Sequence, residues 1–172
     1  FGYLEIIKKE KLNKNDLAQF FDDYDSEISA EISQCGGEVV RSTESAFVVV
    51  LARSDRENES DIVGRAFRLA RAMLDLLERK FRGMDTDSTP HRLILGYGTM
   101  RRVVRSFGRA VTGDLLHDCR RKAATLGPGR AMVFSRVHDI LAQAESPWLD
   151  LLSPIDDDGF NIDWPKSHNH KF

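Results

Sequence analysis

The fold of this chain is decided by the stretch Val111–Gly129, VTGDLLHDCRRKAATLGPG, which continues into the segment RAMVFS. Gly113 ends an extended segment, and Asp114 is a favourable N-cap because its carboxylate lies near the positive start of a helix. Apolar residues then recur at helical spacing and form one apolar face: Leu115, Leu116, Cys119, Ala123 and Leu126. Gly127–Gly129 ends the helix, because glycine tolerates left-handed dihedral angles and proline cannot continue a helix. The apolar run 131–134 then predicts a buried strand.

The sequence before this stretch predicts alternating strands and helices. Two apolar stripes at helical spacing indicate helices, the first capped by Asn15 and the second by Ser60 or Asp61. Gly36 and Gly37 are expected to end the first of these helices. The predicted strands are rich in β-branched, aromatic and other apolar residues, and they cover Phe1–Ile7, Glu38–Arg41, Ala46–Ala52 and Arg92–Gly96.

The C-terminal part predicts one more helix and a final strand. Ser135 is expected to cap a helix that contains Val137, Ile140 and Leu141. An Asp-Asp-Gly turn signal follows, and apolar residues then alternate with polar ones as in an edge strand: Phe160, Ile162 and Trp164. We therefore expect one domain over 1–165 and a disordered tail over 166–172.

Charge and cysteine content limit the classes of function. A net charge of −2 gives no overall attraction to nucleic acid or to an anionic membrane, so we expect no nucleic-acid partner. No apolar run approaches the roughly 20 residues that a membrane helix needs, so we expect no membrane insertion. Cys35 and Cys119 lack the spacing of a metal site and are interpreted as buried, reduced thiols of a cytoplasmic protein.

The expected elements follow the order β-α-β-β-α-β-α-β with a terminal strand. Strands that are separated by helices and hairpins favour an α+β domain, with helices packed on one mixed, mostly antiparallel sheet. This order is consistent with a ferredoxin-like core.

The motif around residues 113–121 resembles the class III adenylate/guanylate cyclase catalytic domain. Members of that family have a Gly-Asp-x-x-Asn-x-x-x-Arg helix, then a Pro-Gly turn and an Ile-x-Val-Ser strand. Here the pattern begins at Gly113, His117 replaces the Asn, and Arg121 keeps the Arg. The resemblance extends upstream through Cys35–Val39 and His91–Gly98, and it implies a degenerate member with the nucleotide-cyclase fold.

The resemblance also implies a divalent metal site, built in the family from one Asp on the first strand and one in a Gly-Asp-Gly hairpin turn. Mg²⁺ prefers such hard oxygen donors, and it neutralises the triphosphate while the ribose 3′-hydroxyl attacks the α-phosphorus. Ser45 stands at the hairpin position, and the first-strand position falls near Tyr3. Glu5 and Glu44 are nearby, but a shift of one residue along a strand turns a side chain to the opposite face. We therefore expect no bound metal and no cofactor.

The family positions that read the base and hold the phosphates are changed as well. The purine-reading Lys corresponds to Arg41, and the Asp or Thr before the motif helix falls at Ala110, whose side chain has no hydrogen-bonding group. His117 removes the amide that orients the ribose in the family. Arg121 remains from the phosphate-handling set, with an ordinary surface arginine as the alternative. Arg121 and Arg41 are thus the candidate contacts for a small anionic or nucleotide ligand.

Three hypotheses for the function remain. The favoured one is a catalytically inactive cyclase-homology domain, not an enzyme, that acts as a dimerisation, ligand-sensing or partner-binding module in a signalling protein. The second is the non-metal-binding subunit of a heterodimeric nucleotide cyclase, to which Arg121 contributes. Both imply a homodimer or a pair with a related cyclase-like chain, because the family's cleft lies between two domains. The third is an anion or nucleic-acid binder that uses Arg101, Arg102, Arg105 and Arg109. The net charge of the chain argues against this third hypothesis.

Overall fold

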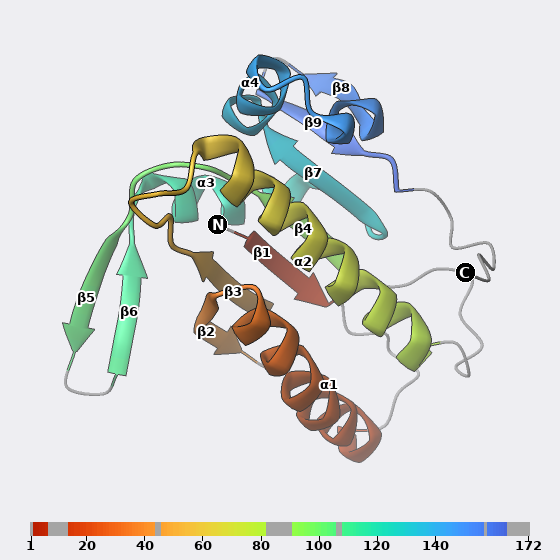
Figure 1. The fold of residues 1–172 in the computed structure, drawn as a ribbon. Coiled ribbons are helices and arrows are strands. Elements are labelled where there is room, and N and C mark those ends of the chain that lie inside the picture. Colours follow the sequence, from red (N-terminus) through yellow and green to blue (C-terminus); the bar gives the residue numbers. More distant parts are fainter. Residues whose placement is uncertain are drawn as a thin grey trace.

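A computed structural model describes residues 2–6, 14–43, 46–81, 91–105, 108–156 and 158–164. Within these residues a mixed sheet of seven strands forms the centre, in the order β2-β3-β1-β4-β7-β9-β8 (Figure 1). Its strands are β1 (Gly2–Ile6), β2 (Gly37–Thr43), β3 (Ala46–Leu51), β4 (His91–Leu95), β7 (Arg130–Phe134), β8 (Leu152–Asp156) and β9 (Gly159–Ile162). Neighbouring strands run antiparallel except β4 and β7, which are parallel. The prediction of a mixed, mostly antiparallel sheet is confirmed.

Helices cover both faces of this sheet. Helices α1 (Lys14–Gln34) and α2 (Glu59–Phe81) lie on one face, and α3 (Asp114–Thr125) lies on the other (Figure 1). Helix α4 (Ser135–Gln143) and the short 3-10 helix η1 (Pro147–Leu151) complete the α1–α2 side. None of these helices, as far as the described residues go, is long and apolar enough to cross a membrane.

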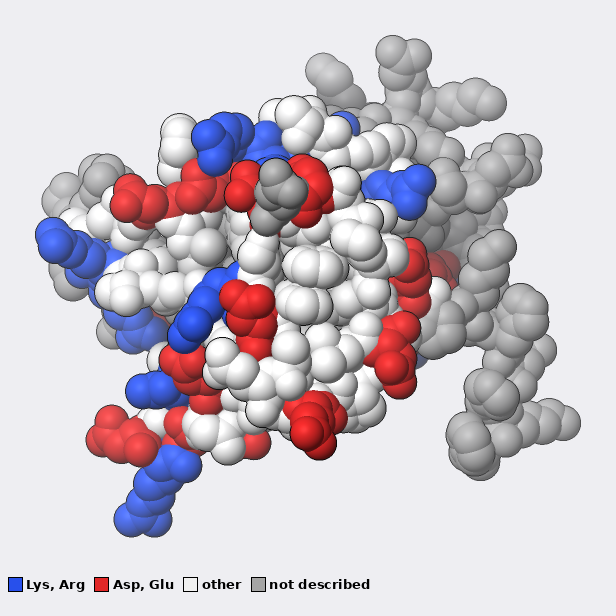
Figure 2. Space-filling view, turned by 90° about the horizontal axis from the view of Figure 1, so that it is seen from above, with Lys and Arg blue, Asp and Glu red and all other residues white. Residues whose placement is uncertain are grey.

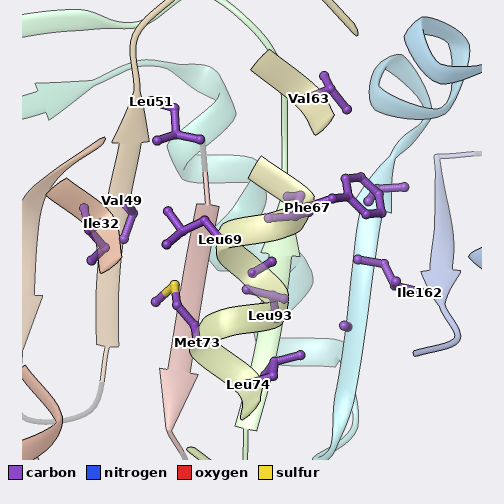
Figure 3. Close-up of a cluster of buried hydrophobic side chains, with 14 of the residues drawn as sticks. Ile32, Val49, Leu51, Val63, Phe67, Leu69, Met73, Leu74, Leu93 and Ile162 are labelled. Atoms are coloured by element: carbon purple, nitrogen blue, oxygen red, sulfur yellow. The ribbon is translucent and has the colours of Figure 1, made fainter. Parts of the chain in front are cut away.

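The two faces receive alternate residues of β3. Phe47, Val49 and Leu51 are buried under α1 and α2, whereas Val48 and Val50 are buried in the cluster that α3 covers. This alternation is the period-2 pattern of a strand that is buried on both faces. Figure 3 shows Leu69 and Met73 of α2 directed at the sheet beside Val49 and Leu51. The continuous apolar run of β3 therefore contributes side chains to the apolar clusters on both faces of the sheet.

Strands β5 (Arg101–Arg105) and β6 (Gly108–Thr112) form a separate two-stranded arm. In the described part of the chain they pair with each other alone, and the arm extends away from the main sheet (Figure 1). The sequence analysis did not predict this hairpin, because its arginine-rich strands lack the alternation of a half-buried strand. The arm joins the end of β4 to the start of α3.

Three of the expected N-caps were wrong. The cap of α2 is Asn58, whose side-chain Oδ1 accepts from the backbone N–H of Asp61 at 2.8 Å and from the Ser60 hydroxyl at 2.7 Å. Asp114 and Ser135 are the first residues of α3 and α4, and neither helix has a side-chain cap hydrogen bond. The carboxylate of Asp114 still lies in the first turn, where the helix dipole favours it.

Other boundaries differ less from expectation. Helix α1 begins at Lys14, one residue before the predicted cap, and Gly36 follows its end with a φ of 65° as predicted. Strand β9 is not the edge strand that was predicted, because residues 152–156 form β8 on its outer side. The predicted tail at 166–172 lies outside the described residues.

Candidate functional site

Helix α3 carries the family motif on an exposed face. Its opposite face is buried against the sheet through Leu116, Cys119 and Ala123. His117 and Arg121 are both exposed and lie one helical turn apart, so their side chains leave the same side of the helix. The buried face thus fixes the orientation of α3, and the exposed face presents an imidazole and a guanidinium to solvent.

The guanidinium of Arg121 is held only weakly within the chain. Its Nη2 donates to Oδ1 of Asp118 at 3.0 Å, and the Arg121 side chain is 67% exposed. Exposed pairs of this kind contribute at most about 1 kcal/mol, because water and salt screen them. An external phosphate or carboxylate can therefore replace Asp118 at little cost.

Two of the sequence-predicted positions lie level with each other across the sheet. The register pairs Tyr3 of β1 and Arg41 of β2 with the same residue of β3, Val48, which packs in the cluster beneath α3. Arg41 stands at a register shift between β2 and β3. The backbone therefore brings these two positions together, although they are 38 residues apart in the sequence.

The other positions predicted from the sequence are not level with Tyr3 and Arg41, or they lie outside the described residues. Ala110 lies in the arm, where β6 pairs it with Val103 of β5. Ser45 and Glu44 lie outside the described residues. Glu5 pairs with Ala46, the residue that directly follows Ser45, so the backbone of β1 passes next to the hairpin turn. No group of three or more His, Cys, Asp or Glu side chains suited to a metal occurs among the described residues.

The exposed face of α3 is separate from three cavities that the described residues form. His117 and Arg121 line none of these three cavities. The two side chains therefore face solvent rather than any of these three hollows.

A second cluster, which the sequence analysis missed, gathers around Glu59 in the first turn of α2. Its Oε1 accepts a 3.1 Å hydrogen bond from the Tyr97 hydroxyl, and its Oε2 accepts one of 3.1 Å from Arg136. Arg53 lies 3.8 Å away. Burial and the hydrogen bond to Glu59 together hold the pKa of Tyr97 above its usual value. No local sequence signal links these residues, because they come from four separate segments.

Charges of both signs are interspersed on the face seen in Figure 2. Lys and Arg lie beside Asp and Glu there, and no field of one sign covers this face. A nucleic-acid surface needs a field of one sign. This face therefore offers no support for the third hypothesis.

Solved structures that are similar to this chain include catalytic domains of nucleotide cyclases. The catalytic core of a rhodopsin-guanylyl cyclase with converted specificity, in complex with ATPαS, matches with a TM-score of 0.73 and 14% identity over 94% of this chain and 92% of that one. The non-canonical dimeric guanylyl cyclase domain of the RhoGC fusion protein from the aquatic fungus Blastocladiella emersonii gives 0.73 and 14% over 94% and 93%. The adenylyl cyclase CyaB from P. aeruginosa gives 0.67 and 12% over 98% and 95%. No family model and no curated protein sequence matches the chain.

These matches correct one expectation. Identities of 12–14% show a shared fold, and that fold extends over more than nine tenths of both chains. The expectation that the chain is not an enzyme was wrong, because the structures that share its fold are guanylyl and adenylyl cyclase catalytic domains.

Proposed function

We propose that this chain, which has the fold of the class III nucleotide cyclase catalytic domain, is one of the two domains of a dimeric nucleotide cyclase. In this assembly the exposed face of α3 contributes His117 and Arg121 to a nucleotide cleft that a partner domain completes. The observation that supports this proposal best is the position of these two side chains, one turn apart on a helix whose other face is anchored in the sheet.

The proposed reaction is cyclisation of a nucleoside triphosphate. The ribose 3′-hydroxyl gives up its proton to water as its oxygen forms a bond to the α-phosphorus, the bond from that phosphorus to the bridging oxygen breaks, and pyrophosphate leaves. Negative charge builds on the phosphate oxygens during this step, so a guanidinium that donates two hydrogen bonds lowers the barrier. Arg121 takes this role, and a ring N–H of His117 donates to a ribose or phosphate oxygen on the same side of α3.

A divalent metal, when bound, would neutralise the triphosphate and lower the pKa of the 3′-hydroxyl. We assign the carboxylates that hold it to the partner domain, because Ser45 stands at the family's hairpin position and a neutral hydroxyl cannot replace an anionic ligand. The partner on this proposal is a related cyclase-like chain rather than a second copy. The free thiols Cys35 and Cys119 fit a cytoplasmic signalling assembly.

The β5–β6 arm is the proposed contact surface for that partner. A two-stranded hairpin is at best marginally stable in water. Its strands pair with no other strand among the described residues, and Arg102 attaches it to β2 through a 3.1 Å contact with Glu38. Packing of the arm against a second domain would bury surface that a single chain leaves exposed.

The test is formation of cyclic nucleotide from ATP or GTP with Mg²⁺ or Mn²⁺. The chain is assayed alone and mixed with each cyclase-like chain encoded in the same genome. We expect turnover in one mixture that far exceeds that of either chain alone. Arg121→Ala should lower this turnover by about 10²-fold, the range found when one charge-stabilising donor is removed. Arg120→Ala is the matched control, because Arg120 is an exposed neighbour on another side of α3.

Two outcomes in the mixtures would contradict the proposal, and so would a third in the assay of the chain alone. One is the absence of product in every mixture, although sedimentation shows that the chains associate. The other is an equal loss of turnover in Arg121→Ala and Arg120→Ala, which would make the effect one of general charge. High turnover by the chain alone would contradict the assignment of the metal-binding carboxylates to the partner domain and would indicate that Glu5 or Glu44 binds the metal.

A further inference from the structure

A cavity of about 310 Å³ lies at the end of the sheet from which the arm leaves. The C-terminal ends of β3 and β4, the N-terminal half of α2, the start of α4 and the base of the arm all contribute to its wall. The hairpin turn between β2 and β3 is at the opposite end of β3. Neither His117 nor Arg121 lines the cavity, so it is separate from the proposed nucleotide contacts.

Most of the wall is aliphatic or aromatic. Leu51 of β3, with Val63 and Phe67 of α2, forms part of it, and Figure 3 shows these three side chains around the N-terminal half of α2. A volume near 300 Å³ is at the lower end of the range for small-molecule sites, which are typically apolar with a few polar groups. A sugar phosphate would lose hydrogen bonds to water here, because an apolar wall cannot replace them. The cavity therefore suits a ligand with an apolar body.

The charged side chains among the described lining residues are both arginines, Arg53 and Arg102. Their carboxylate partners, Glu59 at 3.8 Å and Glu38 at 3.1 Å, do not line the cavity. The Arg53 and Arg102 side chains are 49% and 56% exposed, so both ion pairs are weak and exchangeable. A guanidinium matches the planar, two-oxygen geometry of a carboxylate.

We propose that this cavity binds a small amphipathic carboxylate, with its apolar body between α2 and the sheet end and its carboxylate held by Arg53 and Arg102. Tyr97 also lines the cavity, and its single hydroxyl proton is donated to Glu59, so the two guanidinium groups are the donors for the carboxylate. Because Arg102 and Val111 belong to the two strands of the arm, the ligand connects the arm to α2. Its binding therefore restricts how the arm moves relative to the sheet.

The probe is octanoate, measured by isothermal titration calorimetry on the full chain. 1-Octanol and octylammonium have the same apolar body without the negative charge and serve as ligand controls. We expect one octanoate per chain, bound at least about tenfold more tightly than either control, as the loss of one charged hydrogen bond predicts. ATP should not displace it, because the nucleotide contacts lie elsewhere.

The variants Arg53→Ala and Arg102→Ala should each weaken octanoate binding about tenfold. Arg101→Ala is the matched control, because this exposed arginine is next to Arg102 and does not line the cavity. Ala66→Leu fills the cavity without changing a charge and should abolish binding, while circular dichroism verifies that the variant is folded. Equal binding of the three ligands, equal loss in all arginine variants, unchanged binding in folded Ala66→Leu, or displacement by ATP would each overturn the proposal.

Discussion

Tyr97 donates a 3.1 Å hydrogen bond to Glu59, and this contact joins the segment after β4 to the first turn of α2. The same carboxylate accepts from Arg136 of α4, 77 residues further along the chain. One side chain thus holds together three segments at the rim of the cavity. The removal of this carboxylate should loosen the whole rim.

We expect Tyr97→Phe to lower the free energy of unfolding by about 1 kcal/mol at neutral pH, the usual net value of one hydrogen bond. The pKa of Tyr97 is raised in the folded chain, so its contribution is fully present below the pKa of an unfolded tyrosine. The contribution is lost as pH rises through the raised pKa. Urea unfolding of both proteins at several alkaline pH values measures the effect. A difference in unfolding free energy between the unsubstituted chain and Tyr97→Phe that grows with pH would contradict this prediction.

Arg65 connects α2 to two other segments. Its Nη1 donates to the Cys35 carbonyl at 2.7 Å, and its Nη2 donates to the Ala52 carbonyl at 3.0 Å and to Glu57 at 2.8 Å. Arg65→Met keeps the apolar stem and removes all three hydrogen bonds. We expect a loss of about 2–3 kcal/mol in unfolding free energy, because the Glu57 carboxylate and two backbone carbonyls then lose their partner.

The matched control for this change is Arg68→Met, since Arg68 is an exposed arginine on the same helix. Its replacement should alter the free energy of unfolding by no more than about 0.5 kcal/mol. Chemical denaturation of the three proteins provides the comparison. Equal losses in the two variants would show that the contacts of Arg65 do not contribute specifically.

The two cysteines should differ sharply in reactivity. Cys119 is fully buried on the face of α3 that packs against the sheet, and this burial raises the pKa of its thiol to about 12. Because the thiolate is the reactive form, Cys119 should resist a maleimide at pH 7.5 while the half-buried Cys35 reacts. Mass spectrometry of peptides after timed labelling measures both rates. Labelling of Cys119 in the native protein as fast as in urea would contradict its burial.

Lys122 connects the end of α3 to the β8–β9 hairpin. Its ammonium donates to Asp156 at 2.9 Å, and this hydrogen bond is the main reason that the pKa of Asp156 is lowered. Lys122→Met should therefore raise the pKa of Asp156, as a carboxyl-detected NMR titration would show. Because the pKa of Asp156 is lower in the folded chain than in the unfolded chain, the ionised carboxylate stabilises the fold at pH values above the unfolded pKa. This stabilisation is lost as the pH falls through the folded pKa. The thermal midpoints of the two proteins should accordingly converge in acid.

Several features of the fold could be predicted because they depend on neighbours in the sequence. The apolar spacing of Leu116, Cys119 and Ala123 predicted the buried face of α3, and all three are buried. The same spacing puts His117 and Arg121 on the opposite side of the helix. The β-branched apolar run of β3 predicted the second arm of the hairpin, and the glycines after α1 predicted the end of that helix. Such patterns repeat within one or two turns, so the local sequence contains them.

The tertiary structure decided the contacts between distant segments. The Glu59 cluster joins four separate segments, and the positions of Tyr3 and Arg41 level with Val48 depend on strand register. The outer strand β8, the β5–β6 arm and the Asn58 cap are local features that the sequence analysis missed; the cap joins residues only three apart. By itself, the sequence determined the residues at the family positions and the order of the strands and helices other than β5, β6, η1 and β8. The tertiary structure alone decided that α3 presents His117 and Arg121 outside every described cavity, and that a separate cavity opens at the base of the arm. The physical reason is that burial and register arise from packing between segments, whereas periodicity arises within each one.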